Sequence, residues 1–116
     1  MKRDMDLIRR ILFEMEKQPF PIRNKIGLPI EGYSPDEITY HIVLLIEAGF
    51  ILGYDVAGKR YPKRLTWEGH EFLDASRDEG RWKKAKKIVA DKAGGISLEV
   101  IKQVLIQLMK DAVLGP

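Results

Sequence analysis

The sequence predicts an α+β fold that combines several helices with short strands. Residues 34–37 read Ser-Pro-Asp-Glu, which is typical of a helix start. Residues 22–31 alternate apolar with polar side chains, and the runs 50–56 and 61–65 are rich in strand-forming residues. The predicted order is helix, strand, helix, two-stranded wing and helix, followed by two additional C-terminal helices. This is the order of a winged-helix-like domain.

A first helix is expected over about residues 5–17. Asp4 can cap it, and its apolar side chains recur at the spacing of a helix packed on a core. These apolar residues are Ile8, Ile11, Leu12 and Met15. The segment 18–21, Gln-Pro-Phe-Pro, ends this helix, because proline lacks the amide donor and restricts the residue before it.

A strand is expected over residues 22–31, where Ile26, Leu28 and Ile30 alternate with polar or small residues. Pro29 indicates a position at the edge of a sheet. A helix-turn-helix would place a helix in this stretch, about one turn before the recognition helix. The expected strand therefore argues against insertion of the following helix into a DNA groove.

The second helix is expected to begin after Ser34 and to run to about Ala48. Serine caps it, proline occupies the first helical position, and Glu37 completes a capping box. Gly49 ends it, because glycine readily adopts the left-handed conformation that follows a helix. The inner stripe of this helix is Ile38, Ile42 and Leu45.

The two strands of the wing are expected at 50–56 and 61–65, joined through residues 57–60. Thr66 caps a short helix to about Ala75. The segment 41–51, in which a leucine-rich turn runs into Glu-Ala-Gly and then a strand, resembles the recognition-helix exit of many bacterial winged-helix regulators.

A charged stretch over 77–80 leads into a basic helix near 81–93, which Gly94-Gly95 ends. A final helix is expected from Ser97 to about Leu114. We expect a single domain over 1–116, with a core at about 4–76 and a C-terminal helical extension at about 77–116.

The composition fits one globular domain. The chain has 116 residues, 45% hydrophobic and 32% charged, with a formal net charge of +3. It contains no cysteine and no apolar run that approaches the roughly 20 residues needed to cross a bilayer. We therefore expect a cytoplasmic protein with no membrane partner, and a basic charge that slightly favours a polyanionic partner.

Five segments recur together in a known family: residues 1–9, 31–34, 40–42, 47–49 and 65–73. In that combination the chain resembles the bacterial and phage family catalogued as domain of unknown function 2513. The resemblance implies a winged-helix fold and a bacterial or prophage setting. It implies no catalytic residues.

The charges favour the wing over the helix before it. No lysine or arginine occurs from residue 31 to residue 58, and the outward face of the second helix carries Asp36, Thr39, Tyr40, Val43 and Glu47. DNA binding depends on neutralising phosphates, so this helix is a poor reader of bases. The wing carries four cations around Tyr61, namely Lys59, Arg60, Lys63 and Arg64. They can contact phosphates, or they can simply keep the hairpin edge soluble and unpaired.

A second basic group lies on the helix near 81–93, with Trp82, Ala85, Ile88 and Val89 as its buried stripe. Its cations are Lys83, Lys84, Lys86 and Lys87. A run of charges on one helix is usually a solvated outer face, and that interpretation is favoured here.

No catalytic, cofactor or metal site is expected. The two histidines, His41 and His70, lack a second ligand at metal spacing, so each is interpreted as structural. The carboxylate pairs Asp4/Asp6, Glu68/Glu71 and Asp78/Glu79 lie at helix starts or in exposed stretches. We expect a binding protein and not an enzyme.

The last helix is apolar beyond a single stripe. Val100, Ile106 and Val113 fall toward or inside its polar arc, opposite or beside the main apolar cluster. This helix either builds a symmetric homodimer or closes the monomer core.

Two functions are consistent with the sequence. The first is a winged-helix protein that binds nucleic acid or acts in transcriptional regulation. Its possible partner is double-stranded DNA, contacted by the wing residues and by Thr39 and Tyr40. The second is an adaptor that keeps the fold and binds a protein without reading DNA.

Overall fold

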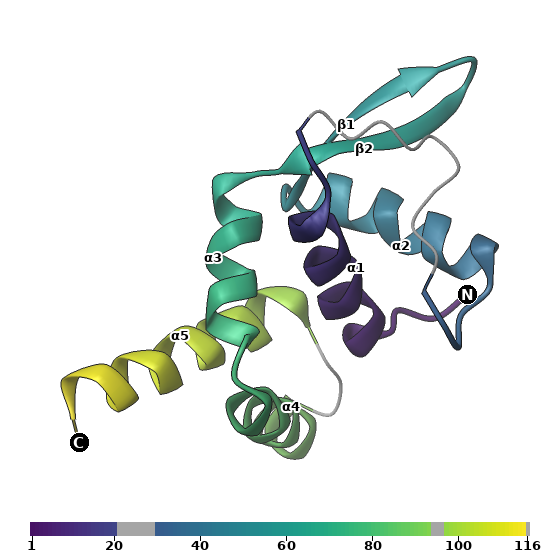
Figure 1. The fold of residues 1–116 in the computed structure, drawn as a ribbon. Helices are drawn as coiled ribbons and strands as arrows, with labels where there is room; N and C mark the ends of the chain where they lie inside the picture. Colours follow the sequence, from purple (N-terminus) through teal and green to yellow (C-terminus); the bar gives the residue numbers. More distant parts are fainter. Residues whose placement is uncertain (21–29, 94–96, 116) are drawn as a thin grey trace. The chain divides into compact units, whose positions relative to one another are not determined.

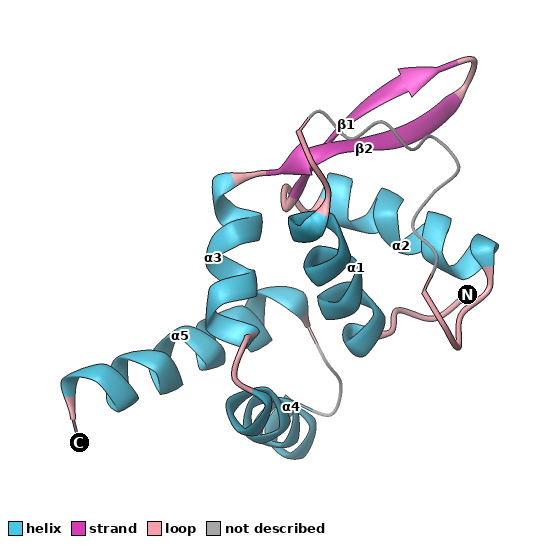
Figure 2. Cartoon of the chain, in the orientation of Figure 1, coloured by secondary structure: helices cyan, strands magenta, loops and turns pink. Residues whose placement is uncertain are grey.

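The computed structural model describes residues 1–20, 30–93 and 97–115. Within them the chain forms helices and one two-stranded antiparallel sheet, which confirms the predicted α+β class (Figures 1 and 2). The predicted strand over 22–31 and the glycine stop at 94–95 lie mainly or wholly outside the described residues. The elements are α1 (Met5–Lys17), α2 (Pro35–Glu47), β1 (Ile51–Val56), β2 (Lys59–Leu65), α3 (Trp67–Ser76), α4 (Glu79–Ala93) and α5 (Leu98–Leu114).

The chain divides into two compact units, residues 1–70 and residues 71–116. The boundary falls inside α3, so the first unit contains α1, α2, the hairpin and the first turn of α3. The second contains the rest of α3 together with α4 and α5.

Helix α1 begins and ends as its sequence predicts. The Asp4 carboxylate accepts the Leu7 amide at 3.1 Å, which satisfies one of the free donors at the helix start. The predicted apolar stripe is buried throughout, and Met5 and Leu7 are buried with it. The helix ends at Lys17, directly before the segment that contains Pro19.

Helix α2 carries the predicted capping box. The Ser34 hydroxyl accepts the Glu37 amide at 3.1 Å, and the Glu37 carboxylate accepts the Ser34 amide at the same distance. Gly49 follows the helix at φ +82°, a conformation that a side chain would strain. The inner stripe is buried as predicted, and His41 is buried beside it.

His41 ties the start of α1 to α2. Its Nε2 accepts the Asp4 amide at 2.8 Å, and its Nδ1 lies 2.7 Å from the carbonyl oxygen of Glu37. A backbone amide needs an acceptor and a carbonyl needs a donor, so the two contacts select the neutral tautomer protonated at Nδ1. Both nitrogens of this 1% exposed side chain are satisfied. The interpretation of His41 as a structural residue fits this geometry.

The hairpin is tighter than predicted. Strand β2 begins at Lys59 and not at residue 61, so the connection is the two residues Ala57 and Gly58. Both have positive φ, 52° and 80°. Two consecutive residues of this kind make the primed turn whose twist matches the right-handed twist of the strands. The predicted loop over 57–60 is too long, because two consecutive residues with positive φ are enough to reverse the chain.

The root of the hairpin is bound closely to the start of α3. The Thr66 amide donates to the Phe50 carbonyl at 3.0 Å, and the Thr66 hydroxyl donates to the Gly49 carbonyl at 2.5 Å. The same hydroxyl accepts the Gly69 amide at 3.1 Å, which confirms the predicted cap. A Cβ added to Gly69 would overlap the Phe50 carbonyl. Only glycine allows this approach of helix to backbone.

In the second unit an aromatic pair joins α3 to α4. Phe72 and Trp82 meet edge to face with centroids 6.2 Å apart, and both are buried. Arg81 donates from Nε to the Ala75 carbonyl at 2.7 Å, which satisfies an acceptor at the end of α3.

Helix α4 begins at Glu79, two residues before the predicted start. Asp78 takes the cap position, and its carboxylate accepts the Arg81 amide at 2.7 Å. The predicted connection over 77–80 is therefore wrong at residues 79 and 80, because an aspartate before a helical run is a capping signal. Helix α5 packs on α4 and buries Ile101 and Leu105. Among the described residues, none of the helices has the length and apolar character that would let it cross a membrane.

Candidate nucleic-acid interface

The outer face of α2 is acidic and exposed. Asp36, Thr39, Tyr40 and Glu47 are exposed, and Val43 is half-buried. The Tyr40 ring packs edge-on against His41 with centroids 5.7 Å apart, so its position depends on the buried face of the same helix. This face offers hydroxyl groups and carboxylates to a partner. It does not supply the cations that phosphate neutralisation needs.

Lys59 lies at the tip of the hairpin beside an aromatic pair. It stands opposite Val56, and alternation places it on the same face as Tyr54 and Tyr61. These two rings stack with centroids 5.7 Å apart and planes at 30°. Lys59 is exposed, as is Val56 at 44%. This face therefore combines a cation with neighbouring aromatic and apolar side chains.

Arg60 points to the other face of the hairpin. It stands opposite Asp55, and its Nε lies 3.3 Å from the Asp55 carboxylate. Their side chains are 46% and 67% exposed, so water screens the pair and its contribution to stability is small. The pair nevertheless offsets one of the four cations that were predicted to act together.

Lys63 and Arg64 lie at an irregularity of the ladder. Residues 52 and 53 pair with residues 64 and 62, so Lys63 is the extra residue of a bulge. Arg64 donates from one terminal nitrogen to the Leu65 carbonyl at 3.0 Å, and its side chain stays exposed. The two consecutive cations border a pocket of about 410 Å³. The hairpin thus distributes its four cations over a tip, a back face and a pocket rim.

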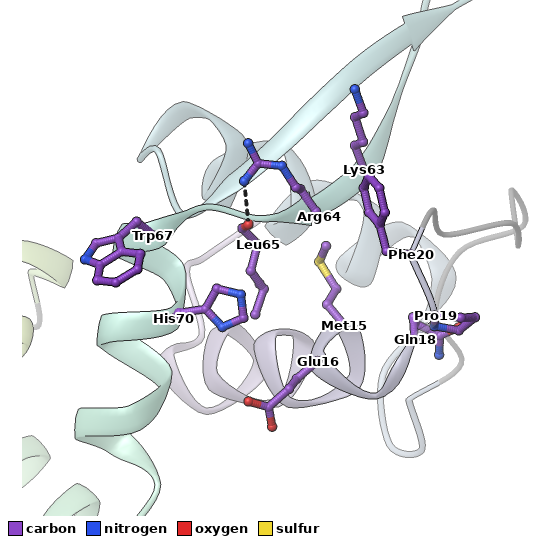
Figure 3. A pocket seen from close by; sticks show the side chains of 10 residues that line it. All are labelled: Met15, Glu16, Gln18, Pro19, Phe20, Lys63, Arg64, Leu65, Trp67 and His70. Carbon is purple, nitrogen blue, oxygen red and sulfur yellow. Dashed lines mark hydrogen bonds between the residues drawn. The ribbon is translucent and has the colours of Figure 1, made fainter.

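This pocket lies between the end of α1, strand β2 and the start of α3 (Figure 3). Its apolar floor includes the buried side chains of Met15 and Leu65. Phe20 and Trp67 stand at its sides and are 70% and 77% exposed. Among the described residues, the lining is Met15, Glu16, Gln18, Pro19, Phe20, Lys63, Arg64, Leu65, Trp67 and His70.

The pocket was missed at the level of sequence. Phe20 was seen only as part of a helix stop, and Trp67 only as part of a family segment. A usable signal was present for Trp67, because the buried stripe of α3 holds Gly69, Phe72 and Leu73, and Trp67 projects from the opposite side of the helix. A tryptophan outside a buried stripe indicates an exposed binding surface.

The remaining predicted residues lie at the pocket, on α4 and on α5. His70 is exposed at the pocket, unlike the buried His41. On α4, Lys83, Lys84 and Lys87 are exposed, and Lys86 lies 5.6 Å above the Trp82 ring. On α5, Val100 and Val113 are 40% and 77% exposed, and Ile106 is half-buried.

Partial burial, followed by the nearby Asp4 carboxylate, raises the pKa of Tyr33, which lies before α2. Within residues 1–20, 30–93 and 97–115, no three histidine or carboxylate side chains converge as metal ligands would.

Fold and surface together define a small α+β protein in which a cation-bearing hairpin follows a capped helix, with further helices at the C-terminal end. The chain belongs to the family described as "Hypothetical protein (DUF2513)", whose model matches residues 2–96. This confirms the resemblance in the sequence. The chain is also similar to a protein of Haemophilus influenzae (strain ATCC 51907 / DSM 11121 / KW20 / Rd) named "Uncharacterized protein". The two are 35% identical over 108 residues, which cover 90% of this chain and 92% of that protein. No solved structure matches the chain.

Proposed function

We propose that this protein binds nucleic acid through phosphate contacts made by the hairpin, and that it acts by binding and not by catalysis. The observation that carries the proposal is the exposure of Lys59, Lys63 and Arg64 without an ion pair to any described carboxylate. Phosphate neutralisation supplies most of the non-specific affinity of proteins for nucleic acid. In a winged-helix layout the hairpin after the second helix is the part that contacts the backbone.

We expect α2 to contribute little to the recognition of bases. Its outer face bears Asp36 and Glu47, which repel phosphates, and Thr39 and Tyr40 offer only neutral hydroxyl groups. We therefore expect binding that depends strongly on salt and weakly on sequence. A role in transcriptional regulation would require specificity from DNA shape or from a partner protein.

Fluorescence anisotropy with a labelled mixed-sequence duplex tests the proposal. Three phosphate contacts give a salt slope of about −2.7, so binding weakens about 40-fold when salt rises fourfold. An absence of binding at low salt ends the proposal.

A triple variant tests the location of the contacts. Changing Lys59, Lys63 and Arg64 to alanine should abolish the salt-dependent binding. The matched control changes Lys83, Lys84 and Lys87 of α4 to alanine, which removes the same charge from another exposed surface. Equal losses in both triple variants would show that net charge and not the hairpin governs binding.

A protein partner is the second candidate, and the acidic outer face of α2 favours it. Such a face would suit a basic partner, with Tyr40 as an exposed aromatic contact, 39% accessible. Capture on the immobilised protein after nuclease treatment tests this candidate. A partner that is retained by the native chain and lost with Tyr40→Ala supports it, and an empty eluate contradicts it.

We propose separately that the chain forms a homodimer through α5. Val100, Val113 and Leu114 are exposed apolar side chains on this helix, and in the proposed dimer a second copy of the chain covers them. Sedimentation of the native chain and of Val113→Glu tests it. A strict monomer at high micromolar concentration contradicts the dimer.

A further inference from the structure

We infer that the pocket beside the hairpin accepts unpaired nucleotides, so that the protein prefers single-stranded nucleic acid to an intact duplex. This inference rests on the proposed function, because it specifies which form of nucleic acid the hairpin cations serve. It concerns the lining residues Phe20, Lys63, Arg64 and Trp67.

The two aromatic side chains are placed as stacking surfaces. Phe20 and Trp67 are 70% and 77% exposed, although burial of either ring would stabilise the fold. Figure 3 shows them on opposite sides of the pocket, with Leu65 and Arg64 between them. Each ring offers a separate platform, as in grooves that bind single strands by stacking successive bases.

The cations lie where the backbone of such a strand would pass. Lys63 and Arg64 both line the pocket, and Figure 3 shows Arg64 between the two rings and Lys63 next to Phe20. Arg64 uses one terminal nitrogen for the Leu65 carbonyl, which leaves other guanidinium donors for a phosphate. Aromatic platforms interleaved with cations are the combination that binds single strands without sequence preference.

The shape and remaining polarity of the pocket agree with this occupant. Its volume of about 410 Å³ lies in the range of ligand pockets, and Met15 and Leu65 give it an apolar floor. The acidic residue of the lining is Glu16. In Figure 3 its carboxylate lies across Met15 from Lys63, so the negative charge is away from the cationic rim.

A duplex cannot use this pocket in the same way. Bases paired inside a duplex are stacked on their neighbours and would have to be extruded, at a cost of a few kcal/mol per base. An unpaired strand has its bases available, and its phosphates still meet Lys63 and Arg64. The acidic outer face of α2 then has no role in recognition.

The test compares an oligothymidylate of about 15 nucleotides with a duplex of equal length, both labelled and at low salt. The single strand should bind at least about fivefold more tightly. Binding should also quench tryptophan fluorescence, because Trp67 is exposed whereas Trp82 is only 1% exposed. Trp67→Phe should keep the affinity, since phenylalanine also stacks, and should lose the quenching.

The alanine variants Phe20→Ala and Trp67→Ala should each weaken binding of the single strand by at least about fivefold. Their effect on the duplex should be below twofold. Lys84→Ala, which removes an exposed side chain of α4 outside the pocket, is the control and should change neither affinity by more than about twofold. Thermal melting of each variant checks that the fold is retained.

The experiment distinguishes failure of this inference from failure of the proposed function. If the duplex binds as tightly as the single strand, and the two alanine variants change neither, the inference is overturned while the proposed function stands. If neither nucleic acid binds, both fail together. If an acidic peptide quenches Trp67 and the oligothymidylate does not, the pocket serves a protein partner and the inference is overturned.

Discussion

The outer face of α2 and the hairpin are neighbours in sequence but carry opposite charge. From residue 31 to residue 58 there is no lysine or arginine, whereas β2 carries four cations within six residues. The helix is capped and packed as a recognition helix would be, yet its exposed residues are acidic or neutral. The hairpin is short, and its exposed side chains include four cations and one carboxylate, Asp55, which pairs with Arg60.

The difference shows that a chain can have the element order of a winged helix without the helix surface that usually reads DNA. The layout needs only buried stripes, caps and a tight turn, and both regions supply these. Groove reading needs a cationic or amide-bearing helix face, which α2 lacks. If nucleic acid is bound, the hairpin and the pocket beside it are the parts suited to binding it.

The largest effect is expected where the hairpin contacts the start of α3. We expect Gly69→Ala to destabilise the fold by about 3 kcal/mol, because its Cβ would overlap the Phe50 backbone and no rotamer relieves the overlap. Denaturant unfolding measures the loss. Gly80→Ala is the control, since its nearest contact would be Asp78 at 3.4 Å, and alanine is the better helix former. A stable Gly69→Ala protein would show that the hairpin root is not so closely held.

We expect substitutions on the inner face of α2 to lower the free energy of unfolding more than substitutions on its outer face. His41→Leu should cost about 2 kcal/mol, because the Asp4 amide loses its acceptor. His70→Leu removes an exposed imidazole and should change the free energy of unfolding by less than about 0.5 kcal/mol. Equal effects at the two positions would contradict the assignment of His41 as the link between α1 and α2.

Charge reversal compares the two surfaces directly. Lys59→Glu should weaken duplex binding several-fold and should reduce the salt slope by about 1 or more. Glu47→Lys adds a cation to α2, and we expect less than a twofold change because this face is not against phosphates. Salt titrations by anisotropy measure both variants. Strong tightening by Glu47→Lys would instead place the nucleic acid against α2.

The turn of the hairpin can be improved without touching its cations. Ala57 has φ of +52°, a conformation that asparagine adopts more readily than alanine. Ala57→Asn should stabilise the fold by about 0.5–1 kcal/mol and leave binding unchanged. Ala57→Val should destabilise it, because a β-branched residue is strained at positive φ. Denaturant midpoints of the two variants should therefore move in opposite directions.

The smallest expected effect concerns the pair on the back face of the hairpin. Asp55→Asn frees Arg60 and removes a carboxylate, so binding of nucleic acid should tighten about twofold. Stability should fall by no more than about 0.5 kcal/mol, because the pair is exposed. Glu47→Gln removes the same charge from α2 and should leave binding unchanged. If both variants tighten binding equally, only net charge matters.

Much of the fold could be predicted from local patterns. The caps at Asp4, Ser34 and Thr66 and the apolar stripes of α1 and α2 are all present as predicted. The errors occurred where two local signals overlapped. Asp78 is both part of a charged run and a cap, and Lys59 is both next to a turn and the first residue of a strand.

The candidate site could be predicted only in part. The four wing cations were found because they are concentrated in β2, but their separation depends on pairing and on the bulge. The pocket could not be predicted, because Met15, Phe20, Lys63 and Trp67 come from three segments that only the fold brings together.

The sequence by itself determined where the helices begin, which faces are apolar and which segments are basic, because caps, periodicity and charge are local properties. The tertiary structure alone decided that Arg60 meets Asp55, that His41 joins two helices, and that Phe20 and Trp67 line one pocket with Lys63 and Arg64. These depend on strand register and on contacts between distant segments, and packing sets both.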